Sequence, residues 1–135
     1  MPKTLALVLL VALVAVIAGA IFSRRSATAD LTGDAGVIAQ LRKLGSDLSK
    51  PHPVEFFLYF PTEVGANRVA DKLATQGFTS TVKPAASGSS LPWHTFATLQ
   101  IVPTIGAMAK LRAELSELSA SEGGEYDGWG TPLVK

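Results

Sequence analysis

Two histidines and one carboxylate pair are the side chains in this 135-residue sequence whose types could support catalysis or metal binding. His52 and His94 lie about forty residues apart in the chain. A metal site needs three or four convergent ligands, and neither a His-x-His nor a His-x-x-x-His spacing occurs. We therefore expect each histidine to lie at the surface or at the end of a strand, and we expect no metal site and no cofactor.

Glu125 and Asp127 are separated by one residue, which places both carboxylates on one face of a strand. Two carboxylates can act as general acid and base, but they need a pocket and a raised pKa on one of them. The sequence contains neither the Gly-x-Ser-x-Gly motif of hydrolases nor the glycine-rich phosphate-binding motifs Gly-x-x-x-x-Gly-Lys and Gly-x-Gly-x-x-Gly. We expect no catalytic residue. The alternative is a small hydrolase or ligand-binding protein of the envelope that uses Tyr126, Asp127 and His94 in a pocket.

The charged residues are distributed unevenly. The sequence has 12 Lys and Arg against 11 Asp and Glu, but residues 4–23 carry no charge at all. From Asp30 onward there are nine basic and eleven acidic residues, which gives a net charge of −2. A mildly acidic domain is a poor candidate for binding phosphate backbones, so we expect no direct contact with nucleic acid. The absence of cysteine excludes disulfides and thiolate metal sites.

Residues 4–23 predict a single transmembrane helix. Twenty uncharged residues at a rise of about 1.5 Å span roughly 30 Å, the thickness of the hydrocarbon core of a bilayer. We expect residues 1–25 to anchor the protein in a bacterial inner membrane and residues 26–33 to form a linker. Cleavage near Ala29, which would release a periplasmic or secreted protein, is the alternative. Basic residues flank the segment on both sides, so its orientation stays open.

The remaining residues, 34–135, predict one α+β domain. Apolar spacing and proline and glycine punctuation indicate helices over 34–45, from Thr62 to Gly77 and from Thr104 to Gly123. Strands are expected over 54–60, 78–83, 93–102 and 125–134. After the first, amphipathic helix, the order βαββαβ with right-handed crossovers gives a ferredoxin-like sandwich, a four-stranded antiparallel sheet with two helices on one face.

The same element order occurs in RNA-recognition modules, whose aromatic side chains stack bases on the open face of the sheet. Phe57 and Tyr59 on the first strand, with Trp93 or Phe96 on the third, could take comparable positions. The basic, glycine-rich aromatic run of those modules is missing, and the domain is net acidic. Binding of single-stranded RNA is therefore a less favoured alternative.

The most distinctive run of the sequence lies near its end. Gly128 and Gly130 flank Trp129 there, which suggests a backbone with positive φ or in close contact with a neighbouring segment beside the large ring. The run is Glu125-Tyr126-Asp127-Gly128-Trp129-Gly130-Thr131. It resembles the C-terminal signature of the regulator of ribonuclease activity B family, the ribonuclease E inhibitor proteins. Its candidate interaction residues are Glu125, Tyr126, Asp127, Gly128, Trp129 and Gly130.

This resemblance implies a ferredoxin-like, non-enzymatic protein that binds a protein partner, with ribonuclease E as the partner of the family's inhibitors. Another membrane-associated protein is the alternative partner. Those inhibitors carry an acidic tail after the signature, which this sequence lacks. The weaker charge steering predicts weak inhibition by the domain once it is freed from the membrane segment.

Overall fold

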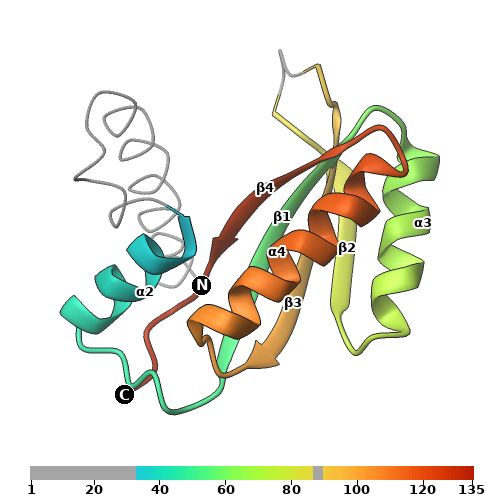
Figure 1. Cartoon of the computed structure of the whole chain (residues 1–135). Coiled ribbons are helices and arrows are strands. Elements are labelled where there is room, and N and C mark those ends of the chain that lie inside the picture. Colours follow the sequence, from blue (N-terminus) through green and yellow to red (C-terminus); the bar gives the residue numbers. More distant parts are fainter. Residues whose placement is uncertain (1–32, 87–89) are drawn as a thin grey trace. The chain divides into compact units, whose positions relative to one another are not determined.

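The computed structural model describes residues 33–86 and 90–135, so the predicted membrane helix at 4–23 and nearly all of the predicted linker lie outside the described residues. The elements in chain order are α2 (Gly33–Lys43), β1 (His52–Phe60), α3 (Glu63–Ala74), β2 (Thr79–Pro84), β3 (Trp93–Ile101), α4 (Ile105–Ala120) and β4 (Glu125–Gly130) (Figure 1). None of the described helices combines the length and the apolar character that a bilayer crossing requires.

The four described strands form one antiparallel sheet in the order β2-β3-β1-β4. β2 and β3 pair in antiparallel register, with Lys83 opposite His94 and Thr81 opposite Phe96. The domain is therefore of the α+β class. The predicted succession of strands and helices after the first helix is confirmed.

Local signals in the sequence set several of the element boundaries. The Thr62 hydroxyl accepts a hydrogen bond from the Gly65 N–H at 3.0 Å and caps α3, and Thr104 caps α4 through the Ala107 N–H at 3.1 Å. Gly77 follows α3 with φ +94, a left-handed conformation that favours glycine. These threonine caps and this glycine terminator were predicted, and they are confirmed.

β1 begins two residues earlier than predicted, at His52 instead of Val54. Pro51 and Pro53 predicted a break before the strand, because proline lacks an N–H for the sheet ladder. Proline is tolerated near the first residues of a strand, and Pro53 takes such a place. At the other end of the domain, β4 stops at Gly130, so the predicted final strand of residues 125–134 is too long by four residues.

The chain divides into two compact units, which we describe separately. The sheet unit comprises Glu55–Leu99 and Lys110–Trp129. Its strands pack beneath α3 and the C-terminal part of α4, which lie on the same side of the sheet (Figure 1). The buried side chains of this core are Phe56, Leu58, Phe60, Ala66, Val69, Leu73, Phe78, Ala97, Leu111, Leu115 and Trp129. Burial of each large side chain contributes about 1.5–3 kcal/mol.

The tail unit comprises the described part of Met1–Val54 together with Gln100–Ala109 and Gly130–Lys135. Val37, Ile38 and Leu41 form the buried stripe of α2. Met108 from α4 and Val54 from β1 are also buried in this unit. The amphipathic character predicted for the first helix is confirmed by this stripe.

Candidate functional site

β1 divides its side chains between the two faces of the sheet. Phe56, Leu58 and Phe60 are fully buried, whereas the alternate residues Glu55, Phe57 and Tyr59 are only half-buried. Because successive strand residues point to opposite faces, the second set lies on the face away from α3 and α4. We call this the far face.

β3 and β2 extend the far face. The Thr95 hydroxyl donates a 3.0 Å hydrogen bond to the Ala66 carbonyl of α3, so Thr95 lies on the helix-covered face. Its neighbours His94 and Phe96 therefore lie on the far face. Lys83 joins them, because residues directly opposite in antiparallel strands point to the same side.

β4 contributes carboxylates to the same face. The ring centroid of Tyr126 lies 6.4 Å from that of Phe56, which places Tyr126 on the helix-covered side. Glu125 and Asp127 then lie on the far face, as their i, i+2 spacing predicted. The sheet-face cluster, as we name it, consists of Glu55, Phe57, Tyr59, Lys83, His94, Phe96, Glu125 and Asp127.

Four aromatic rings occupy the centre of this cluster. The Tyr59 and His94 rings are stacked, with centroids 4.6 Å apart and planes 12° from parallel. Phe57 lies 6.1 Å from His94 at 21° and 5.6 Å from Phe96 at 49°. His94 is only 9% exposed. The rings form a continuous apolar surface with an imidazole in the middle.

Burial shifts the titration of the polar groups around these rings. It lowers the pKa of His94, and the positive charge of Lys83 lowers it further, so the imidazole is neutral at pH 7. Asp127 is exposed, but partial desolvation by its neighbours raises the pKa of its carboxyl, and repulsion by Glu125 adds to this. The pKa values of Glu55 and of Tyr59 are raised by burial as well, that of Tyr59 also by the Asp127 charge. Asp127 and Tyr59 therefore interact electrostatically.

Two polar atoms of the cluster are buried without a hydrogen-bond partner among the described residues: Nε2 of His94 and Oε1 of Glu55. Buried polar atoms are normally paired, so such atoms call for an explanation. The described residues also contain no group of three His, Asp or Glu side chains that could hold a metal ion. The arrangement is suited to binding a ligand through rings and hydrogen bonds.

The hydrolase arrangement of Tyr126, Asp127 and His94 is not assembled. Tyr126 lies on the helix-covered face, whereas Asp127 and His94 lie on the far face. Adjacent residues of a strand point to opposite faces, so these three side chains do not converge on one pocket as that alternative required. Of the aromatic residues proposed for base stacking, Phe57, Tyr59 and Phe96 share the far face. Trp93 does not, because it is two residues from Thr95.

The signature residues 125–130 have different roles in the fold. Glu125 and Asp127 are exposed, Tyr126 is half-buried, and Trp129 is 4% exposed and belongs to the core. Gly128 has φ +130, which fits the predicted need for a glycine beside the tryptophan. The role of these six residues as an interaction site stays a prediction.

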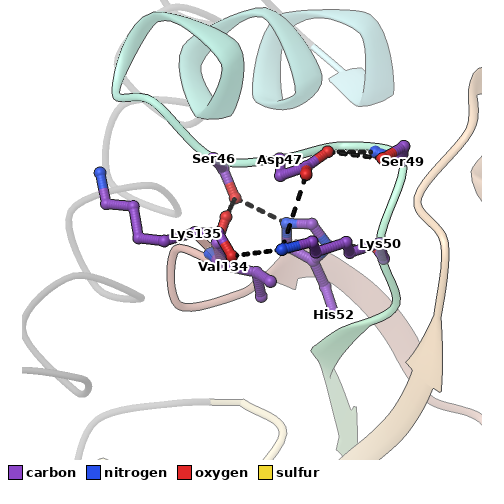
Figure 2. Close-up of polar contacts among 7 residues, drawn as sticks. All are labelled: Ser46, Asp47, Ser49, Lys50, His52, Val134 and Lys135. Carbon is purple, nitrogen blue, oxygen red and sulfur yellow. Dashed lines mark hydrogen bonds and ion pairs between the residues drawn. The ribbon is translucent and has the colours of Figure 1, made fainter.

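A second polar arrangement, in the tail unit, was missed by the sequence analysis (Figure 2). Nδ1 of His52 lies 2.8 Å from the Lys50 carbonyl, which can only accept, so Nδ1 carries the hydrogen. Nε2 then accepts from the Ser46 hydroxyl at 2.6 Å, and the same hydroxyl oxygen accepts the Val134 N–H at 2.9 Å. We call this set of contacts the tail clasp.

The backbone of Asp47 and the side chain of Lys50 complete the tail clasp. The Asp47 N–H donates to the Val134 carbonyl at 2.6 Å, and the Lys50 ammonium donates to the Lys135 carbonyl at 2.8 Å (Figure 2). A Ser–His pair can activate a nucleophile. Here, however, both side chains are buried, and the hydroxyl is engaged by Val134. The tail clasp is thus structural. His52 lies at the end of a strand, as predicted, because it is the first residue of β1, and its side chain is buried there.

A groove of about 590 Å³ lies between α3 and the end of α4, within the sheet unit. It is lined by Lys72, Gln76, Glu114, Leu115, Glu117, Leu118 and Ser121. Charges of both signs line it, and it contains neither a histidine nor an aromatic ring. It offers less chemistry than the sheet-face cluster.

The sequence model of the family described as Regulator of ribonuclease activity B matches residues 32–131. The search of curated proteins found no match. A solved structure with some likeness is the Bacillus subtilis YXEP protein, described as a dinuclear metal-binding peptidase of the M20 family. It is 13% identical, with a TM-score of 0.38, over 63% of this chain and 26% of that chain. This chain thus spans about a quarter of that structure, and so low a score transfers neither fold nor activity.

Proposed function

Because the chain belongs to the regulator of ribonuclease activity B family, we propose that it is a non-enzymatic binding protein that regulates RNA degradation, with ribonuclease E as its partner. The observation that carries this proposal is the extent of the family match, which contains every strand of the sheet and the signature residues 125–130. The sheet-face cluster supports it, because it provides a ring surface for binding.

The proposal includes a ferredoxin-like fold for the domain. The order βαββαβ along the chain and the order β2-β3-β1-β4 across the sheet both support it. In such a fold the two helices cover one face and leave the other available for contacts. The far face is therefore the natural interaction surface of the domain.

We further propose that residues 4–23 anchor the domain in the bacterial inner membrane as a single pass. The support is the run of twenty uncharged residues followed by Arg24 and Arg25. Mass spectrometry of the mature protein tests this: a chain that retains residues 4–23 supports the anchor, and one that begins at Asp30 overturns it. Regulation of RNA decay also requires a domain that faces the cytoplasm, which a reporter fusion at the C-terminal end reports.

The direct test measures RNA cleavage by purified ribonuclease E at fixed salt, with increasing amounts of the full chain in lipid nanodiscs. We expect the cleavage rate to fall and to saturate, while empty nanodiscs leave it unchanged. An unchanged rate at a large excess of the chain contradicts the proposal. If the chain alone, without ribonuclease E, cleaves RNA faster than empty nanodiscs do, the proposal that it is non-enzymatic is contradicted.

Membrane attachment should strengthen the inhibition. The net charge of −2 over residues 30–135 gives weak steering toward a basic surface on a partner. Confinement with a partner on one membrane can raise the effective concentration to about the millimolar range. We therefore expect the full chain, placed on vesicles that also carry tethered ribonuclease E, to inhibit more strongly than a fragment that starts at Asp30. Equal inhibition by both forms contradicts the role of the anchor.

A further inference from the structure

We propose that the sheet-face cluster binds an arginine side chain from a basic segment of a protein partner, with the planar guanidinium stacked on the Tyr59–His94 rings and paired with the surrounding carboxylates. The inference rests on the proposed function in one respect, namely that the partner is a protein. It names the surface and the chemistry of the residue that the surface recognises.

The ring geometry favours a planar cation. Tyr59 and His94 are 12° from parallel at 4.6 Å, and Phe57 is 21° from His94, so the three rings share an orientation. A guanidinium is flat and weakly hydrated, and it stacks on aromatic faces. A lysine ammonium is a compact, strongly hydrated point charge and gains less from such a surface.

The charges of the cluster favour a cation over a phosphate. Glu55, Glu125 and Asp127 oppose the single positive charge of Lys83, and His94 is neutral. None of the ion pairs found within residues 33–86 and 90–135 involves these three carboxylates. A cation placed among them would stabilise Asp127 and Glu125, whose charges repel each other, and the desolvated carboxylate of Glu55. An RNA backbone would meet a net negative surface.

The buried polar atoms supply a second, independent argument. His94 is nine-tenths buried, and its Nε2 has no hydrogen-bond partner among the described residues. Oε1 of Glu55 is buried and unpartnered as well. A guanidinium carries five N–H donors in a fixed fork, so it can donate to Oε1 of Glu55, and to Nε2 of His94 in the tautomer that carries its hydrogen on Nδ1.

The test uses the full chain in a neutral detergent and three fluorescein-labelled probes: a peptide of four Arg-Gly repeats, its Lys-Gly counterpart and a twelve-residue oligouridylate. Fluorescence anisotropy at fixed salt reports binding. We expect saturable binding of the arginine peptide, about fivefold tighter than that of the lysine peptide. We expect no saturable binding of the RNA.

Variants assign the binding to the surface. Asp127→Asn removes one charge at constant shape, and Tyr59→Leu removes one ring; each should weaken arginine-peptide binding about fivefold. Tyr59→Phe keeps the ring and should bind as the original chain does, which separates the ring from the hydroxyl; an unchanged circular dichroism spectrum of Tyr59→Leu excludes loss of folding. Asp71→Asn, the same change on the exposed surface of α3, is the matched control and should have no effect.

Equal binding of the two peptides, or binding that is insensitive to Asp127→Asn and Tyr59→Leu, overturns the proposal. Tighter binding of the oligouridylate overturns it in favour of RNA. The same variants in the ribonuclease E assay separate this proposal from the proposed function. Selective arginine binding without inhibition of ribonuclease E supports the arginine site and contradicts the proposed function. Inhibition that neither Asp127→Asn nor Tyr59→Leu changes supports the proposed function and contradicts the arginine site.

Discussion

Replacement of Ser46 by alanine tests the tail clasp directly. The Ser46 hydroxyl donates to Nε2 of His52 at 2.6 Å and accepts the Val134 N–H at 2.9 Å. It also lies 3.3 Å from the Val134 carbonyl, but its single hydrogen is better used by the shorter contact with His52. The variant keeps both partner groups in place and removes the oxygen that joins them.

The cost follows from how well water could replace the hydroxyl. His52 is fully buried, so its Nε2 is left unsatisfied, which typically costs about 1–3 kcal/mol. Val134 is half-buried, so part of the cost of its N–H is recovered by solvent. We expect a total loss of about 2–4 kcal/mol in the free energy of unfolding. For a domain of this size it corresponds to a Tm lower by about 10–20 °C.

The assay is thermal and urea unfolding of the full chain in neutral detergent, followed by circular dichroism. Ser49→Ala is the matched control, because Ser49 is exposed and its hydroxyl donates to the Asp47 carboxylate, at 2.6 Å. Its loss should cost about 0.5 kcal/mol. If Ser46→Ala costs no more than Ser49→Ala, the tail clasp contributes nothing to stability and the reasoning fails.

Other substitutions test the core, the turn before β4 and the far face. Gly124→Ala should lower the free energy of unfolding in urea by about 3 kcal/mol or more. A Cβ at this position would collide with the Tyr59 carbonyl oxygen near the end of β1 and would lie 2.5 Å from a ring carbon of Phe60. Gly106→Ala, with open space around the new methyl group, should be neutral or stabilise by up to about 1 kcal/mol. Trp129→Ala should cost about 3–5 kcal/mol, and an unchanged Tm contradicts its place in the core. Asp127→Asn should raise Tm slightly at pH 7, because the pKa of the Asp127 carboxyl is raised in the folded state and stability is lost as the pH rises through it; the exposure of the side chain keeps the effect small. Below a pH of about 3.8, the unfolded pKa, Asp127 is neutral in both the folded and the unfolded protein. A difference in Tm between Asp127→Asn and the original chain that persists at pH 3 therefore contradicts this cause.

Local patterns in the sequence were sufficient to predict the order of the elements. Thr62 and Thr104 marked helix starts, because their hydroxyls replace missing backbone acceptors in the first turn. The placement of Phe57 and Tyr59 together on the open face, and the i, i+2 spacing of Glu125 and Asp127, also assigned side chains to faces correctly. The same alternation argument, applied to Tyr126 and Asp127, would have excluded the pocket that combined them with His94.

The tail clasp could not be predicted in this way. Ser46 and Val134 are 88 residues apart, and nothing in either neighbourhood of the sequence indicates the other. The stacking of Tyr59 on His94 likewise depends on the packing of β1 beside β3, which local patterns leave undefined. The signal that could have identified the cluster is the pair of runs Phe57-x-Tyr59 and His94-x-Phe96, each with two rings on one face of a strand.

The place of β1 in the sheet has a consequence for synthesis of the chain. β1 lies between β3 and β4, although β4 is the last strand to be made. At about 5–20 residues per second, the ribosome finishes β4 roughly 4–14 s after β1. Throughout that interval the run Phe56-Phe57-Leu58-Tyr59-Phe60 has an unpaired strand edge, which is prone to pair with other chains. A nascent chain stalled before residue 125 is therefore expected to depend on chaperones, and translation speed over the last seventy residues should affect the soluble yield.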